Sequence, residues 1–365
     1  MKTLGLFALS GCLALVSCST QRYVGSHGEK PAVPAVVSAP ALPARNATPP
    51  ARNVILMIGD GMGSEHVWAA WLANQGSLNI TTLPVNGFSV TTSASHLVTD
   101  SAAGGTAIAC GCKTKNGQLG ITADGKPMDS LAVKMREAGK SAGLVVTKSI
   151  TDATPAAFYA HVKSRKETAA IADALVKSDF EVIVGGGSAD FRAEQLATLE
   201  KKCQLFELAA PGNCVAAAKR PGWLASRVQK ALDVLSKDKE GFFLMVEGSK
   251  IDVEAHLNLL TGTVEETLDF DQAVGVVLRW MQKHPDTLLV VTADHQTGGL
   301  SILGGDKEKG EVKGHFSTHH HSGVAVPVYA AGAGASAFAG VQENTAFFTK
   351  IQNAAGLDSR ARTAK

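Results

Sequence analysis

Acidic residues and histidines occur in this chain at spacings that suit metal binding. Asp252 and His256 are four residues apart in EGSKIDVEAH, so on a helix they would share one face and could hold one ion. Asp294 and His295 are adjacent in VTADHQTGG. Taken alone, the first pair is better explained as a pair on a helix surface, and the second is equally well explained as a polar strand end. The chemistry that both pairs would support is the binding of a divalent cation.

Further candidates are scattered through the sequence. Asp60 lies between glycines in GDGMG, where the backbone can approach an ion or a phosphate closely. Asp152 and Thr154, in TDATP, could ligate or orient a hard cation. Arg165 follows them, and a guanidinium is the preferred bidentate partner of phosphate, although an isolated arginine is usually a surface charge. The tract His319–His321 could bind metal or could simply be solvated.

Ser101 is a candidate nucleophile in HLVTDSAAGGTAIACG. It is followed by small residues and is expected to begin a helix, whose positive end would favour a phosphorylated serine. No general base lies nearby in the sequence. A Ser-His-Asp hydrolase remains an alternative, but the chain lacks the G-x-S-x-G elbow around Ser101.

The elements that would position these residues alternate between strand and helix. Short apolar runs predict strands at 53–59, 141–150, 180–187, 241–248, 287–295 and 325–332, and helical spacing covers 165–178, 223–238, 263–285 and 344–356. This order predicts an α/β fold, a three-layer α/β/α sandwich with a central, largely parallel sheet. Asp60, Glu247 and Asp294 each follow a predicted strand. Sites form at the carboxyl ends of such strands, so we expect a cation site there.

Six segments occur in an order that resembles the alkaline phosphatase family: GDGMG, TDSAAGGTA, DATPAAFYAHVKSR, VEGSKIDVEAH, VTADH and HHSG. The resemblance extends from about residue 52 to about residue 334. It implies hydrolysis of phosphate monoesters to alcohol and inorganic phosphate through a phosphoserine, with two Zn²⁺ ions and one Mg²⁺ ion.

The resemblance also implies a role for each site residue. Ser101 would be the nucleophile and Arg165 would clamp the phosphate. His321, which precedes Ser-Gly, fits the family pattern better than His319 or His320. The implied metal ligands are Asp252, His256 and His321 for the first zinc; Asp60, Asp294, His295 and Ser101 for the second zinc; and Asp60, Thr154 and Glu247 for magnesium, with Asp152 ordering magnesium-bound water. One departure is the apolar Val253, where several family members carry a polar or cationic residue.

Two alternatives to a monoesterase remain. One is a related two-metal phosphodiesterase or sulfatase, although the combination of Thr154, Glu247 and Arg165 favours monoesters. The other is an inactive phosphate- or metal-binding lipoprotein on the same fold. The 365 residues carry a net charge of only +2 and few aromatic residues, which argues against a dedicated nucleic-acid partner.

The first 18 residues resemble a secretory signal peptide that ends in the lipoprotein-like LVSC. This predicts cleavage before Cys18 and its lipidation, although an ordinary signal peptide with a chance cysteine is the alternative. Residues 19–51 are rich in Pro and Ala and predict an extended tether, and 52–365 would form the catalytic domain. We therefore expect a protein of the periplasm or cell envelope, anchored to a bacterial membrane.

The four cysteines outside the signal could oxidise in an exported protein. Cys203 and Cys214 are spaced for a short disulfide loop, whereas Cys110 and Cys112 are expected to be small packing residues. The segment between His295 and His321 is short. In larger family members this region takes part in dimer contact, so a homodimer remains an open question.

Overall fold

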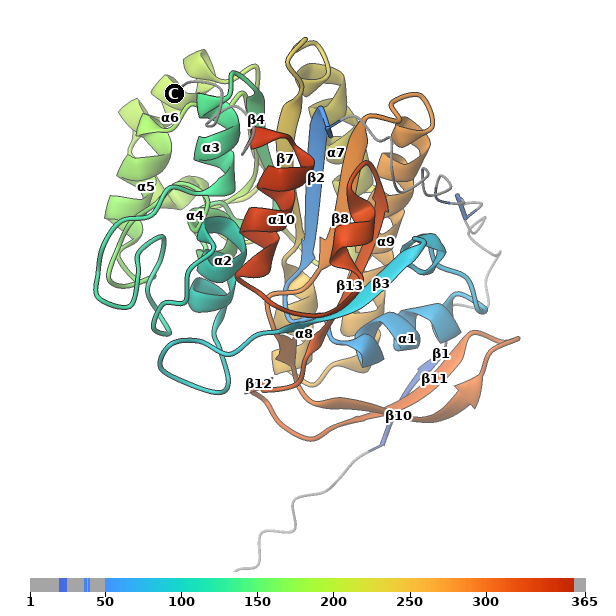
Figure 1. The fold of residues 1–365 in the computed structure, drawn as a ribbon. Helices are drawn as coiled ribbons and strands as arrows, with labels where there is room; N and C mark the ends of the chain where they lie inside the picture. Colours follow the sequence, from blue (N-terminus) through green and yellow to red (C-terminus); the bar gives the residue numbers. More distant parts are fainter. Residues whose placement is uncertain (1–19, 25–35, 38, 40–49, 358–365) are drawn as a thin grey trace, which may run out of the picture.

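The computed structural model describes residues 20–24, 36–37, 39 and 50–357, and its centre is a nine-stranded sheet (Figure 1). Strand β13 runs antiparallel to both of its neighbours, and every other pairing in this sheet is parallel. Across the sheet the strands are β14 (Gly340–Glu343), β3 (Val85–Val90), β13 (Val326–Gly332), β8 (Thr287–Thr292), β2 (Asn53–Gly59), β7 (Phe242–Gly248), β4 (Ser141–Ser149), β5 (Val182–Gly186) and β6 (Leu205–Leu208).

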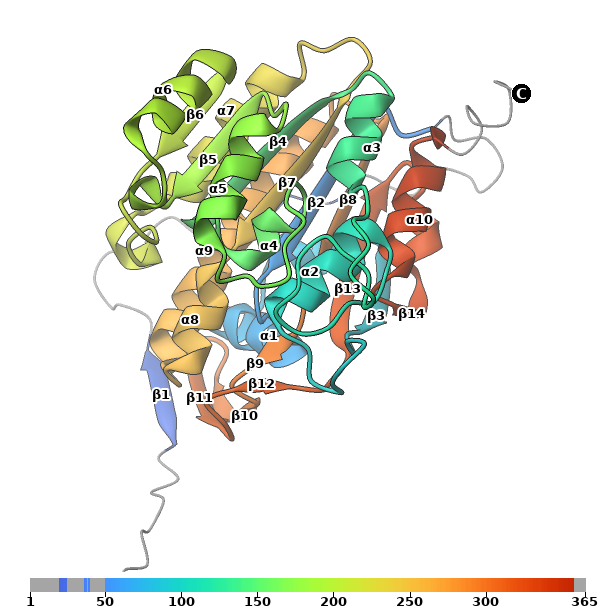
Figure 2. The same cartoon turned by 90° about the vertical axis from the view of Figure 1, so that its left-hand side faces the viewer.

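Helices cover both faces of this sheet, which confirms the predicted three-layer sandwich (Figures 1 and 2). Strand β2 shows why: Val54, Leu56 and Ile58 belong to one hydrophobic cluster, whereas Ile55 and Met57 belong to the other. A strand that is buried on both faces reads as a continuous apolar run. The helices of the first cluster are α2 (Ser101–Cys110), α3 (Leu131–Glu137), α5 (Thr168–Lys177), α6 (Ala193–Lys202) and α10 (Ala346–Ala354); those of the second are α1 (Ser64–Ala73), α7 (Trp223–Leu235) and α9 (Leu260–Met281).

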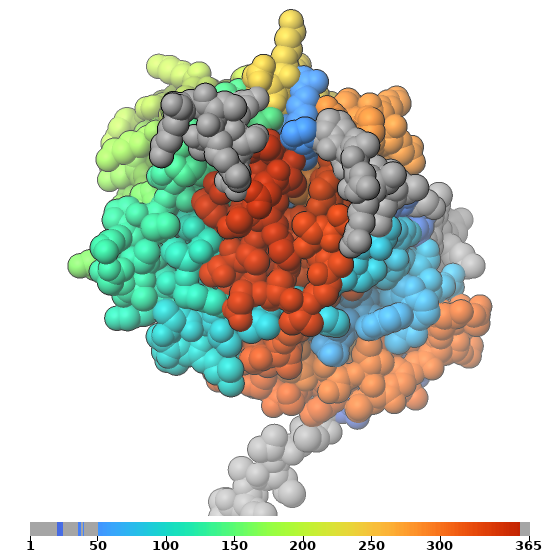
Figure 3. All heavy atoms as spheres, viewed as in Figure 1, coloured from blue at the N-terminus to red at the C-terminus, as the bar shows by residue number. Residues whose placement is uncertain are grey.

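Helix α10, the last helix in the sequence, is prominent at the surface. In the space-filling view, residues near the C-terminus, in red, occupy the middle of the face seen in Figure 1 (Figure 3). Phe347 and Ile351 of α10 are fully buried in the first cluster. The predicted closing helix therefore covers part of one face of the sheet.

A small second sheet contains a strand that the sequence did not predict. Strand β1 (Gln21–Val24) pairs antiparallel with β11 (Glu311–Phe316), which pairs in turn with β10 (Leu300–Asp306). Tyr23 packs against the third apolar cluster, and Arg22 pairs with Glu311 at 2.6 Å. Further along, the Val37 amide donates to Asn79 Oδ1 at 3.0 Å. The range 19–51 was predicted to be an extended tether, but these parts of it are bound to the domain: β1 at the edge of β11, and Val37 at Asn79.

The remaining sequence predictions divide. Cys203 and Cys214, whose spacing left a disulfide open, are free thiols. Cys203 caps α6, whereas Cys214 is buried against Thr147 of β4. Cys110 lies in the core cluster and Cys112 packs against it, as expected. Cys18 and the signal segment fall outside the described residues. Within the described ranges, none of the helices combines the length and the apolar character that a membrane crossing requires.

Candidate active site

The carboxyl ends of three neighbouring strands bring the predicted acidic residues together. Strand β2 lies between β7 and β8, and Ile58 is in register with both Glu247 and Thr292. Asp60, Glu247 and Asp294 are therefore side by side, and each is 0% exposed. Two short helices, α4 (Ala153–Ala156) and α8 (Lys250–His256), add further residues at this edge.

Three oxygen atoms converge on one histidine nitrogen. His295 Nε2 lies 3.1 Å from Ser101 Oγ, 3.3 Å from Asp294 Oδ2 and 3.5 Å from Asp60 Oδ1. Burial holds the pKa of His295 well below its usual range, so this imidazole is neutral. A neutral ring cannot satisfy three oxygens with one nitrogen, whereas a cation placed among the four could. We call Ser101, Asp60, Asp294 and His295 the His295 group.

The same geometry argues against a Ser-His-Asp triad. In a triad the carboxylate holds the ring nitrogen opposite to the one that faces the serine. Here Asp60 and Asp294 lie on the serine side of His295, and the opposite nitrogen, Nδ1, lies 3.3 Å from Thr297 Oγ1. The ring is arranged as a metal ligand, with its second nitrogen oriented by a neighbouring hydroxyl.

A second set of ligands, the His256 group, consists of Asp252, His256 and His321. His256 Nε2 lies 3.2 Å from Asp252 Oδ1 and 3.1 Å from His321 Nε2, and His321 Nε2 lies 3.5 Å from Asp252 Oδ1. The Nδ1 atoms of both histidines contact backbone carbonyls, those of His319 and Thr99. Each Nε2 is thereby turned towards Asp252, which is the arrangement of metal-binding histidines.

The structure also separates the three consecutive histidines. His321 forms the start of strand β12 (His321–Ser322), which pairs with β9 (Gln296–Thr297) directly after His295. His319 points its ring at the carbonyl of His256 and at Asn258, and both His319 and His320 are exposed. His321 is therefore the member of the tract that reaches the site.

Buried oxygen atoms without partners mark a third position. Thr154 Oγ1, both carboxylate oxygens of Glu247 and Asp60 Oδ1 are buried and have no hydrogen-bond partner in the described structure. Burial raises the pKa of Glu247 to about 8. Unpaired polar atoms of this kind are costly, and an all-oxygen donor set is what Mg²⁺ prefers. We call Asp60, Thr154 and Glu247 the oxygen group.

Arg165 is held beside the start of helix α2. Its guanidinium pairs with Asp152 at 3.0 Å and with Asp100 at 3.4 Å. Asp100 caps the helix by accepting a hydrogen bond from the Ala103 amide at 3.0 Å, and Ser101 is the first helical residue. The Arg165 side chain is 27% exposed, so it is accessible from solvent.

The small residues that follow Ser101 allow helix α2 to lie against the backbone of Asp294. A Cβ added to Gly104 would lie 2.8 Å from the Asp294 backbone oxygen. Any larger residue there would push α2 away from Asp294. The close packing brings the serine and the positive end of its helix to the His295 group.

Sequence reasoning missed two residues. Thr297 Oγ1 donates to Asp252 Oδ1 at 2.6 Å and also contacts His295, so one hydroxyl touches both the His256 group and the His295 group. Lys148, near the end of β4, pairs with Asp152 at 2.6 Å and Asp60 at 3.3 Å. A lysine at the end of a buried strand was the available signal for the second.

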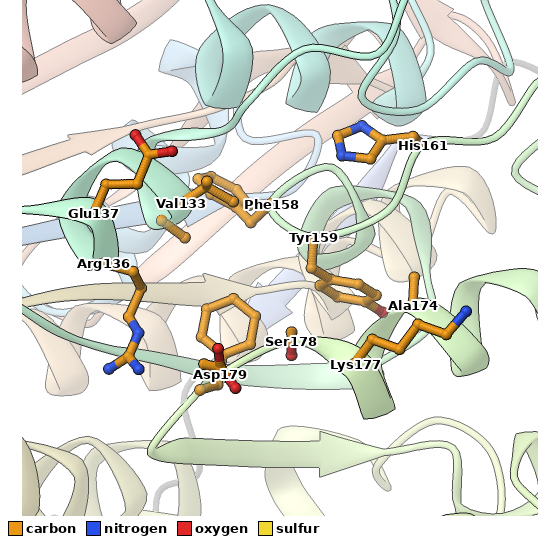
Figure 4. Close-up of a pocket in the computed structure, with 12 residues that line it drawn as sticks. Val133, Arg136, Glu137, Phe158, Tyr159, His161, Ala174, Lys177, Ser178 and Asp179 are labelled. Carbon is orange, nitrogen blue, oxygen red and sulfur yellow. The ribbon is translucent and has the colours of Figure 1, made fainter.

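A separate cavity of about 570 Å³ lies between α3 and α5 (Figure 4). Phe158, Tyr159 and Phe180 line it, together with charged residues such as Arg136 and Lys177. None of the site residues described above is among its lining residues. The cavity is therefore separate from the site formed by the His295 group, the His256 group and the oxygen group.

Comparison with known families gives a consistent match. A family model described as alkaline phosphatase matches residues 51–204 and 195–315. Alkaline phosphatase 4 of Bacillus subtilis is 37% identical over 296 residues, which span 71% of this chain and 64% of that protein. Streptomycin-6-phosphate phosphatase of Streptomyces griseus is 33% identical over 426 residues, which span 88% of this chain and 95% of that protein.

Solved structures show the same similarity in three dimensions. The alkaline phosphatase of the Antarctic bacterium TAB5 has a TM-score of 0.80 and 33% identity, and the match covers 85% of this chain and 99% of that one. A variant of that enzyme has been solved with Mg bound in its M3 site. A cold-active alkaline phosphatase from a Shewanella species has a TM-score of 0.79 and 28% identity.

Proposed function

The chain belongs to the alkaline phosphatase family of metal-dependent phosphatases, and from this premise we propose that it hydrolyses phosphate monoesters through a phosphoserine on Ser101. The observation that carries the proposal is the convergence of Ser101 Oγ, Asp60 Oδ1 and Asp294 Oδ2 on His295 Nε2. Among the hydrogen bonds of the described residues, the Ser101 hydroxyl contacts one basic side chain, and that is His295 of the proposed metal site. The nucleophile and the ligands form one cluster.

The proposed cofactors are two Zn²⁺ ions and one Mg²⁺ ion. Imidazole and carboxylate ligands suit zinc, so the His295 group and the His256 group would each hold one Zn²⁺. The oxygen group would hold Mg²⁺, with Asp60 shared between it and the His295 group. When bound, these ions would lower the pKa of the serine hydroxyl and of water and would stabilise charge on the attacking and leaving oxygens.

The residues of the chain would act in two displacements. Ser101 Oγ forms a bond to phosphorus while the ester P–O bond breaks, and the departing alcohol takes up a proton. A water oxygen then bonds to phosphorus, the Ser101–phosphorus bond breaks, and inorganic phosphate leaves. Arg165 would hold the non-bridging phosphate oxygens during both steps, and the helix start would stabilise their negative charge.

The test is replacement of Ser101 in zinc- and magnesium-loaded protein. Ser101→Ala should lose at least about a thousandfold in kcat and should trap no phosphoenzyme after an acid quench with radiolabelled substrate. Ser89→Ala is a matched control, because Ser89 is also buried and its hydroxyl has no partner. Full activity in Ser101→Ala would refute the nucleophile assignment.

Three substrate classes distinguish the alternatives. We expect a phosphate monoester to be turned over faster than a phosphodiester or a sulfate ester. A preference for the diester or the sulfate would favour the related two-metal hydrolases. No turnover by a fully metal-loaded protein would instead leave a phosphate- or metal-binding protein.

We further propose that the protein is exported and carries a lipid on Cys18, which would place it in the periplasm or cell envelope. The support is the apolar segment of residues 4–16 followed by LVSC. Growth with a labelled fatty acid should label the wild type but not Cys18→Ser. Equal labelling of both proteins would overturn the lipid site.

A further inference from the structure

A lysine lies among the carboxylates of the metal-type site. Lys148 is the eighth residue of strand β4, and its side chain is only 11% exposed. Its Nζ atom lies 2.6 Å from Asp152 Oδ2, 3.3 Å from Asp60 Oδ2 and 3.9 Å from Asp252 Oδ2. These three carboxylates belong to different elements and are brought together only by the fold.

Lys148 lies beside the buried oxygens of the oxygen group that have no hydrogen-bond partner, but it donates no hydrogen bond to them. Lys148 contacts Asp60 through Oδ2, whereas Asp60 Oδ1, Thr154 Oγ1 and both oxygens of Glu247 remain without partners. The ammonium group therefore lies beside the oxygen group and does not satisfy it. It shares Asp60 with the position where a cation would bind.

Few other positive charges lie near these acids. Among the ion pairs of the described residues, Lys148 is the one lysine or arginine within 4 Å of Asp60 or Asp252. Asp152 is flanked by Lys148 on one side and by Arg165 on the other. Lys148 thus contacts Asp60 of the His295 group and Asp252 of the His256 group. It also pairs with Asp152, which in turn pairs with Arg165, the arginine that would bind phosphate.

We propose that Lys148 is a fixed cation that shares Asp60 of the oxygen group with Mg²⁺, and that it lowers both the affinity of this protein for Mg²⁺ and its dependence on that ion. The proposal rests on the function proposed above. A positive charge a few ångströms from a divalent ion repels it strongly in a buried site. The same charge relieves repulsion between Asp60, Asp152 and Asp252 when no ion is present.

This role differs from a purely structural one in the sign of its effect. Loss of a structural salt bridge would loosen the ligands and weaken metal binding. Loss of a competing charge would leave the oxygen group more negative, so Mg²⁺ would bind more tightly. The zinc-loaded protein would then work poorly until Mg²⁺ was added.

The experiment compares Mg²⁺ binding by zinc-loaded wild type, Lys148→Met, Lys148→Gln and Lys148→Arg, using calorimetry without substrate. We expect Met and Gln at this position to tighten Mg²⁺ binding by about tenfold or more, and Arg to behave as wild type. The stimulation of monoester hydrolysis by added Mg²⁺ should rise by a similar factor in the two neutral variants. Lys140→Met is a matched control, because Lys140 is also buried and donates hydrogen bonds to the backbone carbonyls of Arg52 and Glu240.

Unchanged or weaker Mg²⁺ binding in both neutral variants would overturn the proposal. So would a neutral variant whose activity is lost and is not restored by Mg²⁺, or one that fails to fold while Lys148→Arg folds and Mg²⁺ does not restore folding. Because binding is measured without turnover, these results are independent of whether the wild type hydrolyses monoesters. Failure of the proposed function would appear separately, as a wild type that binds metals and cleaves no ester.

Discussion

Without metal ions, this protein should have a lower free energy of unfolding at pH 8.5 than at pH 6.5. One cause is Glu247, whose pKa burial raises from 4.5 to about 8. Since this pKa is higher in the folded state than in the unfolded state, the stability associated with the protonated carboxyl is complete below pH 4.5. It is lost as the pH rises through about 8.

The size of this effect follows from linkage. For a group that titrates near 8 when folded and near 4.5 when unfolded, the free energy of unfolding falls by about 2 kcal/mol between pH 6.5 and 8.5. Asp294, whose pKa burial raises to about 6, adds only a few tenths of a kcal/mol in this window because it is already mostly ionised. The pKa of Asp60 is raised in the same direction, by burial and by its acidic neighbours.

The assay is urea unfolding at the two pH values in the presence of a chelator. Glu247→Gln should reduce the difference, because it cannot ionise. Wild type loaded with zinc and magnesium should show no such fall, since cations then pair with the ionised carboxylates. A metal-free protein that is equally stable at both pH values would refute the reasoning, as would an undiminished fall in Glu247→Gln.

Two further predictions concern single contacts. Thr297→Val should weaken zinc binding by roughly tenfold in a metal titration, because it removes the hydrogen bond to Asp252, a charged acceptor; unchanged zinc affinity would contradict the positioning role of this hydroxyl. Arg220→Met should lower the free energy of unfolding by about 3–5 kcal/mol, because it leaves Glu266 and Asp269 buried without their cation. The activity of the molecules that remain folded should not change, and a loss of kcat would contradict that expectation.

The sequence predicted the acidic edge of the sheet because strand ends can be located from apolar runs. Asp60, Glu247 and Asp294 each follow such a run, and parallel neighbours place their carboxyl ends at one edge. The helix at Ser101 was also predictable from its flanking residues. Local patterns were sufficient wherever the position of a residue is determined by its own strand or helix.

The missed features depend on partners that are distant in the sequence. Lys148 pairs with Asp60, 88 residues away, and Thr297 reaches Asp252, 45 residues away. The state of Cys203 and Cys214 could not be predicted for the same reason, since their spacing said nothing about the end of α6 and the residues of β4 beside which they lie. No local pattern carries this information.

Strand β1 changes the meaning of the Pro/Ala-rich segment. Residues 25–52 run from β1 to β2, so both ends of this segment are attached to the domain. Only residues 19 and 20 separate Cys18 from β1, a distance of at most about 10 Å even when the chain is fully extended. With the proposed lipid on Cys18, the β1–β11 edge would lie against the membrane surface. Residues 25–52 would then connect two strands of the domain and would not serve as a tether between the domain and the membrane. A protease cut within that loop would then leave the enzyme on the membrane, held by the contacts that β1 makes with the domain, among them its pairing with β11 and the packing of Tyr23.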